Sequence, residues 1–289
     1  LLWYTVATGG TGSATAPTPS TATAGTTTYY VSQTILGCEG PRASIAVTIN
    51  PIPLAPVVTT PITYCQFSTT AIALTANGFN LLWYAAPAGG TGSSTAPIPS
   101  TALTGSTDYY VSQTISNCES PRAKITVKIN PAPAIPSVKD TSYCNNINAD
   151  TLKATPLANH SLSWYGSSAT GGTASTFGSK PNTATTGTFS YYVSQINNAT
   201  GCEGARAKIG VTINPLPNAP SVRDTFYCNN ASVDTLRVNP TTGNTILWYG
   251  TSATGGTSSN SAIKPITSVV GTSSYYLSQI TSATGCESL

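Results

Sequence analysis

A block of about twelve residues recurs four times along the chain, and this recurrence limits the fold more than any other feature. The block begins at Leu1 as LLWYTVATGGTG and returns at residues 81–92, 162–173 and 246–257. Its tryptophans, which are spaced by 80, 81 and 84 residues, are Trp3, Trp83, Trp164 and Trp248. A tyrosine pair and a Cys-Glu pair repeat with the same period. A unit of this size is too long for a solenoid repeat and suits a small β-sandwich domain.

The period divides the chain into four repeats, and we use the names first to fourth repeat below. The expected boundaries are 1–50 for the C-terminal part of a repeat, 51–130 and 131–214 for two complete repeats, and 215–289 for a repeat lacking its last strand. Because the chain opens inside a core-like segment without Met, we expect a section of a longer protein. If the ends were genuine, an open sheet could accept a strand from a neighbour.

The second repeat shows the strand pattern most clearly. Residues 71–77 alternate between apolar and polar side chains, which predicts a strand. Residues 79–86 predict a central strand with its tryptophan turned inward, followed by a Gly-Gly turn. The last strand should turn one apolar face inward, made of Ala123, Ile125, Val127 and Ile129 and repeated in the third repeat as Ala207, Ile209, Val211 and Ile213. About seven short strands around one core tryptophan predict an all-β fold of tandem immunoglobulin-like sandwiches.

Proline-rich linkers join the predicted domains. They are INPIPLAPVV, INPAPAIPSV and INPLPNAPSV, each with three prolines. Proline fixes φ and favours the polyproline II conformation, which acts as a semi-rigid spacer. Short and stiff links between domains predict an extended rod.

The composition excludes several classes of function. Charged residues make up only 7% of the chain, and the net charge of +3 is not clustered. A nucleic-acid interface needs a basic face, so none is predicted. No run of 18 apolar residues is present, so no insertion into a membrane is predicted.

Seven cysteines form two series that follow the repeat. Cys38, Cys118, Cys202 and Cys286 precede a glutamate, whereas Cys65, Cys144 and Cys228 follow a tyrosine. Their spacing does not fit a zinc site. It allows disulfides within each repeat, namely Cys65–Cys118, Cys144–Cys202 and Cys228–Cys286, or between neighbours, namely Cys38–Cys65, Cys118–Cys144 and Cys202–Cys228.

Geometry favours one disulfide within each repeat. If the Tyr-Cys strand starts at the N-terminal pole of the sandwich, its cysteine can meet the last hairpin turn at that same pole. The alternative partners are separated by a last strand of about 26 Å and a linker, whereas a disulfide needs Cα atoms within about 7 Å. Cys38 is then unpaired, because its partner is expected upstream of Leu1. Disulfides imply an oxidising, extracellular compartment.

No residue pattern predicts catalysis, a cofactor or a metal ion. His160 occurs in a single repeat and is expected in a solvated loop. The GGTG segments lack the lysine and helix of a phosphate-binding loop, and are interpreted as turns. The Asp140/Asp150 and Asp224/Asp234 pairs are the nearest approach to a calcium site, but the second repeat has no counterpart.

Two further recurring patterns are predicted to be structural. The CExxR segments indicate a surface salt bridge across the base of the last hairpin, for example between Glu119 and Arg122. In each tyrosine pair, one ring should fill the core while the other packs on the outer face. The alternative is that the pairs form a platform for carbohydrate.

The combined pattern LxWY…GG…YYVSQT…GCExPRAxIxVxINPxPxAP resembles the Ig-like modules found in tandem in large secreted proteins of Bacteroidota. The resemblance covers essentially the whole chain in four copies. It implies a cell-surface adhesin or stalk, gliding-motility adhesins among them, or a spacer in a polysaccharide-degrading protein, often exported by type IX secretion. Bacteria of this phylum O-glycosylate Asp-Ser/Thr sites followed by an apolar residue, and Thr151 and Thr235 match that pattern.

The sequence therefore predicts a non-catalytic structural region of an extracellular adhesin, stalk or filament. Its expected partners are neighbouring repeats of the same chain, with identical chains in a filament or surface glycans as further alternatives. A competing hypothesis is a multivalent glycan-binding array, in which weak contacts are summed along the chain. An exposed aromatic residue at the same place in every repeat would distinguish the array from the stalk.

Overall fold

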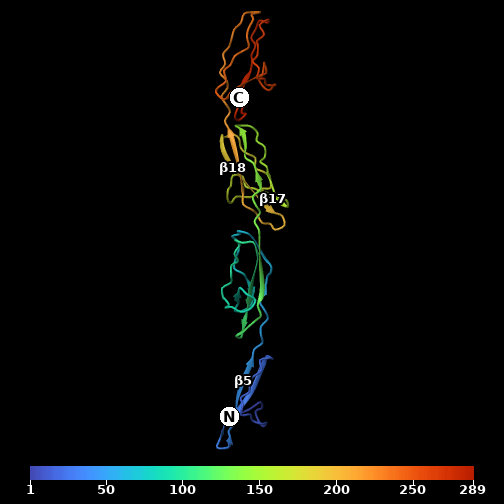
Figure 1. Ribbon diagram of the computed structural model, residues 1–289, viewed down its shortest axis with the longest axis vertical. Coiled ribbons are helices and arrows are strands. Elements are labelled where there is room, and N and C mark those ends of the chain that lie inside the picture. The colour runs from blue at the N-terminus through green and yellow to red at the C-terminus, as the bar shows by residue number, and fades with distance from the viewer. The chain divides into compact units, whose positions relative to one another are not determined.

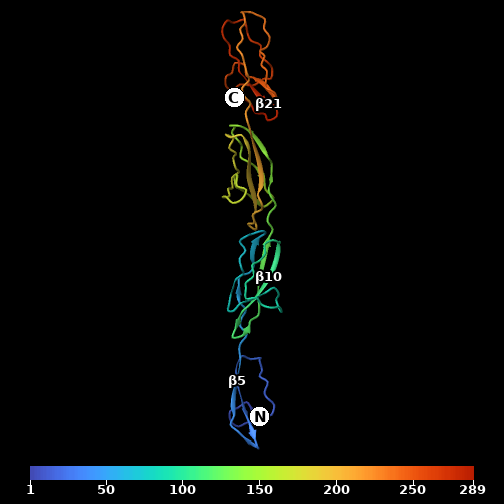
Figure 2. The same ribbon diagram turned by 90° about the vertical axis from the view of Figure 1, so that its left-hand side faces the viewer.

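The computed structural model describes residues 1–289, and every regular element in it is a β-strand (Figures 1 and 2). The prediction of an all-β fold is confirmed. The chain divides into two compact units, Leu1–Pro131 and Ala132–Leu289, each holding two repeats. Each unit is described by itself below.

The second repeat is built around a four-stranded sheet of order β7-β13-β10-β9. Its strands are β6 (Val57–Val58), β7 (Ile62–Cys65), β8 (Ala76–Asn77), β9 (Leu82–Tyr84), β10 (Gly105–Ser112), β11 (Thr114–Ile115), β12 (Cys118–Glu119) and β13 (Ala123–Asn130). β7 runs parallel to β13, whereas β9, β10 and β13 pair antiparallel. The short pairs β6–β8 and β11–β12 complete the repeat.

The core of the second repeat follows the predicted face of its last strand. Ile125, Val127 and Ile129 are buried on β13, and they pack with Trp83 and Leu74 in one cluster. The alternation of residues 71–77 predicts a strand over the whole segment, but only Ala76–Asn77 form a strand. Leu74 instead turns its side chain into the core while its N–H donates to the Pro97 carbonyl. The tryptophan strand is also an edge strand of its sheet, and not a central one as expected.

The third repeat has the same topology. Its strands are β14 (Ser137–Val138), β15 (Thr141–Cys144), β16 (Ala154–Thr155), β17 (His160–Trp164), β18 (Gly187–Asn197) and β19 (Ala207–Asn214), with the sheet order β15-β19-β18-β17. β17 and β18 lie side by side in Figure 1. Ile209, Val211 and Ile213 are buried with Trp164, as the pattern of the last strand predicts.

The first and fourth repeats contain fewer strands. The first forms β1 (Leu2–Tyr4), β2 (Gly25–Ser32), β3 (Thr34–Ile35), β4 (Cys38–Glu39) and β5 (Ala43–Ile49), with β5 at the edge of a sheet of order β1-β2-β5 (Figure 1). The fourth forms only β20 (Asn244–Trp248) and β21 (Leu277–Thr281), which is marked in Figure 2. Trp248 is buried like Trp83 and Trp164, whereas Trp3 is half-buried.

Candidate functional site: the repeated hairpin and the junction between repeats

A cluster of one tyrosine, one serine and one glutamate holds the Cys-Glu turn in every repeat. In the second repeat, Tyr84 Oη and Ser112 Oγ each donate to Glu119 Oε1 over 2.6 Å. The same Tyr–Ser–Glu cluster is formed by Tyr4, Ser32 and Glu39, by Tyr165, Ser194 and Glu203, and by Tyr249, Ser278 and Glu287. It joins the tryptophan strand, the adjacent long strand and the turn, which are far apart in sequence.

The arginine of CExxR contributes mainly through its stacking and its hydrogen bonds to carbonyl groups. Arg122 lies over the Tyr84 ring, 3.2 Å from its centroid, and donates to the carbonyls of Ala86 and Gly89. The equivalent arginines of the first and third repeats make the same ring contact. The expected salt bridge with the glutamate is found in the first repeat, at 4.0 Å. In the second repeat the guanidinium instead binds the Gly-Gly turn. Its planar shape lets two of its nitrogen atoms donate to two carbonyl groups at the same time.

Hydrogen bonding also sets the protonation of the cluster. The two hydroxyl donors lower the pKa of Glu119 below its ordinary value of 4.5, with Ser112 the larger cause and Tyr84 the second. The equivalent donors lower the pKa of Glu39 in the same way. In the third repeat, burial and then the hydrogen bond to its carboxylate partner raise the pKa of Tyr165. A carboxylate held ionised in this way is poorly matched to proton transfer near neutral pH, so the cluster acts as a clamp.

A disulfide joins the third repeat to the fourth, and the prediction of one disulfide within each repeat is wrong. Cys144 of the third repeat is bonded to Cys286 of the fourth, with Cα atoms 5.5 Å apart. Cys118 and Cys228 are free thiols, so neither Cys65–Cys118 nor Cys228–Cys286 exists, and Cys144–Cys202 is excluded by the observed bond. Cys38 is free, while Cys65 and Cys202 are also disulfide-bonded.

The direction of one strand explains the error. The Tyr-Cys strand was expected to start at the pole where the last hairpin turns. Instead β15 runs parallel to the last strand, β19, and its Cys144 lies opposite Asn214 at the C-terminal end of the repeat. The whole length of β19, roughly 26 Å for eight residues, therefore separates this cysteine from the turn of its own repeat. It faces the linker and the turn of the repeat that follows.

Hydrogen bonds at the start of the second, third and fourth repeats tie the linker to the same turn region. Gln113 Nε2 donates to the Leu54 carbonyl over 2.8 Å, and Gln195 and Gln279 do the same to linker carbonyls in the third and fourth repeats. In the first unit, Asn50 Nδ2 donates to the carbonyl of Ser116, in the turn of the second repeat. The linkers are therefore held by side chains as well as by proline.

The sequence interpretation missed the roles of this serine and this glutamine. Both belong to the YYVSQ segment, which predicts a strand but does not show which groups its polar side chains bind. The signal was present, because Ser-Gln recurs unchanged after the aromatic pair in all four repeats. A polar pair that is invariant within a core strand indicates buried hydrogen bonds, and Gln195 and Gln279 are fully buried.

The other candidates form no reactive group. His160 begins β17, rather than lying in the expected loop, and its Nδ1 is 2.8 Å from the Ala158 carbonyl. Asp140 accepts a hydrogen bond from the Gly210 N–H over 2.7 Å. No group of three or more His, Cys, Asp or Glu side chains is placed to hold a metal ion. In the Gly-Gly turn, Gly89 and Gly90 have φ of 69° and 73°, and Trp83 then pairs with Ser93, as expected for a turn.

The recurring tyrosines are partly buried. Tyr109 and Tyr191 pack against the cores of their repeats, and the following tyrosines in the first three repeats are also half-buried. Thr151 and Thr235, the predicted glycosylation sites, are both exposed. Their modification stays a prediction.

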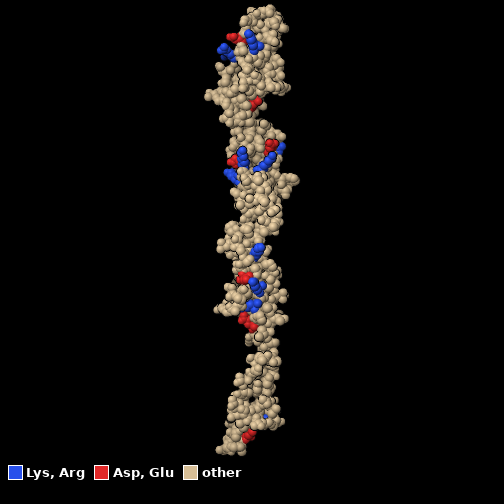
Figure 3. All heavy atoms as spheres, turned by 45° about the vertical axis from the view of Figure 1, so that its right-hand side comes forward, with Lys and Arg blue, Asp and Glu red and all other residues tan.

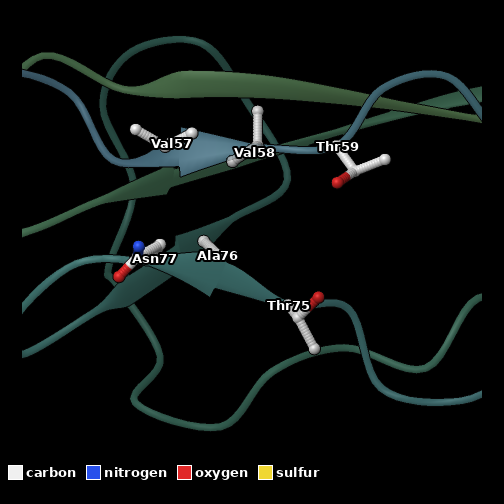
Figure 4. A pocket seen from close by; sticks show the side chains of 6 residues that line it. All are labelled: Val57, Val58, Thr59, Thr75, Ala76 and Asn77. Atoms are coloured by element: carbon white, nitrogen blue, oxygen red, sulfur yellow. The ribbon is translucent and has the colours of Figure 1, made fainter.

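The surface and its hollows are largely uncharged. A shallow hollow of about 420 Å³ is lined by residues of the paired strands β6 and β8 and of their ends, namely Val57, Val58, Thr59, Thr75, Ala76 and Asn77 (Figure 4). None of these side chains titrates near neutral pH. On the face shown in Figure 3, the few basic and acidic side chains lie in mixed groups. The structure holds no helix that is long and apolar enough to cross a membrane.

The fold and the repeated clamp define the class as a tandem array of Ig-like β-sandwich domains. The family model described as "Ig-like domain CHU_C associated" matches residues 1–51, 53–131, 133–215 and 217–289, so the chain belongs to this family in four consecutive copies. A family of this kind indicates a structural or adhesive repeat region and a non-catalytic domain. No curated protein matches the chain.

Solved structures similar to the chain come from several kinds of protein. One is described as Sidekick-1 immunoglobulin domains 1-4, with 14% identity over 86% of this chain and 76% of that one, and a TM-score of 0.21. Another is human mucin-like protocadherin EC1-2, with 9% identity over 53% and 95% of the two chains, and a TM-score of 0.19. A third is an endo-fucoidan hydrolase of glycoside hydrolase family 107, with 10% identity and a TM-score of 0.20. The match covers 69% of this chain but spans only 35% of the hydrolase.

Proposed function

We propose that the chain is a mechanical stalk region of a bacterial extracellular adhesin or filament, which projects another part of its protein from the cell surface. The observation that carries this proposal is the covalent bond between Cys144 and Cys286, which belong to successive repeats. A binding module needs no such bond between domains. A stalk under tension benefits from it, because noncovalent contacts between small domains are weak.

The bond gives tension a path that bypasses most of the second unit. Force entering before Cys144 and leaving after Cys286 passes through the disulfide, since covalent bonds do not yield at forces that unfold β-sandwiches. The two cysteines are 142 positions apart in sequence. The segment between them therefore cannot be pulled out to its full length as long as the bond is intact.

Single-molecule stretching of the full chain tests this role. A fully extended chain spans about 3.4 Å per residue. We therefore expect the maximum extension of the oxidised chain to be roughly 480 Å less than that of the reduced chain. The Cys228→Ser variant is the matched control, because it removes a free thiol and should leave the oxidised length unchanged. Equal maximum extension of the oxidised and reduced chains would contradict the proposal.

Secretion and surface location form part of the same proposal. Disulfides persist in oxidising compartments, and the resemblance to tandem modules of Bacteroidota implies export, in many such proteins by type IX secretion. The exposure of Thr151 and Thr235 supports O-glycosylation at both. Intact mass of protein purified from its own source should show hexose-containing additions that disappear in a Thr151→Ala, Thr235→Ala double variant. A mass equal to that of the unmodified chain would contradict the glycosylation part of this proposal.

A further inference from the structure

Strand β8 of the second repeat ends at an Asn-Gly pair, Asn77-Gly78, which occurs nowhere else in the sequence. The Asn77 side chain is exposed and lines the hollow shown in Figure 4, so water and hydroxide reach it. The main-chain nitrogen of the next residue can attack such a side-chain amide, because the two groups are held close enough to close a small ring. Glycine favours this attack, since it has no Cβ to hinder the approach.

The fold needs no main-chain N–H at the position of Gly78. In the second repeat the Phe79 N–H donates to the Gln113 side chain, and the Leu157 N–H makes the equivalent bond in the third repeat. The residue before Leu157 is Pro156, which has no N–H to donate. The Gly78 nitrogen can therefore react without the loss of a hydrogen bond that the repeat requires.

The fourth repeat contains an asparagine at the same position that cannot react in this way. The Thr241 N–H donates to the Gln279 side chain, as the N–H after Gly78 does in the second repeat. The two residues before Thr241 are Asn239 and Pro240, and this asparagine is also exposed. A proline nitrogen carries no hydrogen that it could lose, so it cannot close the ring. The chain therefore holds a reactive asparagine and an unreactive counterpart at equivalent positions.

We propose that Asn77 is a self-modification site, which converts to aspartate or isoaspartate as the protein ages. The Gly78 nitrogen loses its proton to hydroxide and attacks Cγ of Asn77, and the new N–Cγ bond displaces Nδ2 as ammonia. Water then opens the ring and gives a carboxylate. Opening at Cγ gives aspartate, whereas opening at the main-chain carbonyl carbon gives isoaspartate, in which the main chain runs through Cβ and Cγ. One water is consumed and one ammonia is released, with no oxidation or reduction.

The isoaspartate product should loosen the linker between the first and second repeats. It lengthens the main chain by one carbon at residue 77, just before Phe79, whose N–H donates to Gln113 Oε1 over 3.0 Å. The same glutamine donates through Nε2 to the Leu54 carbonyl of the linker over 2.8 Å. A shift of Phe79 therefore removes one of the two bonds that hold this glutamine between the linker and the sheet. This inference goes beyond the proposed stalk function, because it concerns a covalent change with age.

Peptide mapping of the full folded chain, incubated in ¹⁸O-labelled water, tests the modification. The peptide that contains Asn77 should lose ammonia and gain one labelled oxygen. Its conversion should rise about tenfold per pH unit, because the deprotonated fraction of the attacking nitrogen rises by that factor. The Asn239 peptide is the internal control and should stay unchanged. An unchanged Asn77 peptide in the folded chain, at a time when urea-unfolded chain has converted, would overturn the proposal, as would equal conversion at Asn239.

Two variants separate the ring reaction from hydrolysis by other routes. Gly78→Pro introduces the proline that the third repeat has at this position, and Asn77→Thr introduces its threonine, Thr155. Both variants should abolish the conversion. A Cβ at residue 78 would lie 2.9 Å from Gln113 Oε1, so Asn77→Thr is the variant that leaves the glutamine undisturbed. Conversion of Gly78→Pro at the rate of the unchanged chain would show that no ring forms.

Hydrogen exchange and ¹⁵N relaxation measure the effect on the linker. In the purified isoaspartate form the Phe79 amide should exchange about fivefold faster, as expected for the loss of one hydrogen bond, and Leu54 should become more mobile. The Asn77→Asp variant is the matched control, because it carries the new carboxylate on an ordinary main chain. It should keep the exchange and the mobility of the unchanged chain. Equal values in the isoaspartate form and in Asn77→Asp would contradict the loosening of the linker.

Discussion

The first and second repeats carry nearly the same last strand, yet the two strands lie in different surroundings. ASIAVTI in β5 and AKITVKI in β13 have apolar residues at the same positions. Ile125, Val127 and Ile129 are buried in β13, while Ile45 in β5 is exposed. The alternating pattern therefore determines that a strand forms and which face is apolar. In the second repeat that face packs against side chains from the front half of the repeat, Leu74 and Val58 among them. The given sequence starts at the tryptophan strand of the first repeat and does not include their equivalents.

The third and fourth repeats differ in the length of the strand that carries the tyrosine pair. β18 extends from Gly187 to Asn197 because β19 pairs along its first half. In the fourth repeat the equivalent β21 covers only Leu277–Thr281, and the Tyr275–Tyr276 pair lies outside it. A strand-forming sequence thus stays irregular where no partner satisfies its backbone groups.

Truncating the equivalent isoleucines should give the largest difference between the first two repeats. We expect Ile125→Ala to destabilise the second repeat by about 2–5 kcal/mol, because it leaves a cavity in a closed core. Ile45→Ala should cost less than about 1 kcal/mol, since that side chain is already partly in water. Native-state hydrogen exchange resolved by repeat measures both. Similar losses in the two variants would show that β5 is covered in solution.

Removing a bonded or a free cysteine at equivalent positions should give the next largest difference. Cys286→Ser breaks the bond to Cys144, and we expect the fourth repeat to lose about 2–4 kcal/mol. Cys118→Ser alters a thiol that is not bonded, so the second repeat should change by less than about 0.5 kcal/mol. Hydrogen exchange in non-reducing buffer measures the pair. The prediction fails if reduction of the wild-type chain leaves exchange in the fourth repeat unchanged.

The Tyr–Ser–Glu clamp is local, so its removal should affect the first and second repeats alike. Tyr84→Phe deletes one hydroxyl donor to Glu119 and keeps the ring under Arg122, which should cost about 1 kcal/mol. Tyr4→Phe in the first repeat should cost the same. A large difference between these two variants, measured by exchange in each repeat, would show that the strength of the clamp depends on the rest of its repeat.

The same clamp predicts a pH dependence. Because hydrogen bonds lower the pKa of Glu119 in the folded chain, its stabilisation is complete above the ordinary value of 4.5 and is lost as the pH falls through the lower folded value. Unfolding of the second repeat should therefore become easier below about pH 4.5. In Glu119→Gln this loss of stability at low pH should be smaller. In a control variant of the exposed Lys128 it should stay the same.

The smallest expected effect comes from the arginine stack. Arg122→Lys keeps the charge but loses the planar contact with Tyr84 and the paired hydrogen bonds to the turn. We expect a loss of about 0.5–1 kcal/mol. Arg42→Lys should be equal, because Arg42 makes the same contacts in the first repeat. Hydrogen exchange at the Gly-Gly turns measures both.

Much of the fold could be predicted from local patterns. The apolar face of the last strand, the inward Trp83 and the positive φ of Gly89 and Gly90 all follow from residue type and spacing. The prediction that the tryptophan strand is central is wrong, because the side-chain pattern of a strand shows which face is buried and not what pairs with its edges. The outer edge of this strand pairs only through the bridge from Trp83 to Ser93. The clamp was recognised only in part, since the CExxR spacing shows its arginine and glutamate but not the distant tyrosine.

The sequence by itself determined the repeat, the strands and the identity of the cysteines that recur with them. Their periodicity follows from side-chain alternation and from turn chemistry, which act within a few residues. Only the tertiary structure decided which cysteines meet. That outcome depends on β15 running parallel to β19, which carries Cys144 to the far end of its own repeat and next to Cys286 of the following one. Parallel and antiparallel neighbours demand the same alternation of side chains, so the direction of an edge strand leaves no mark in the pattern of its residues.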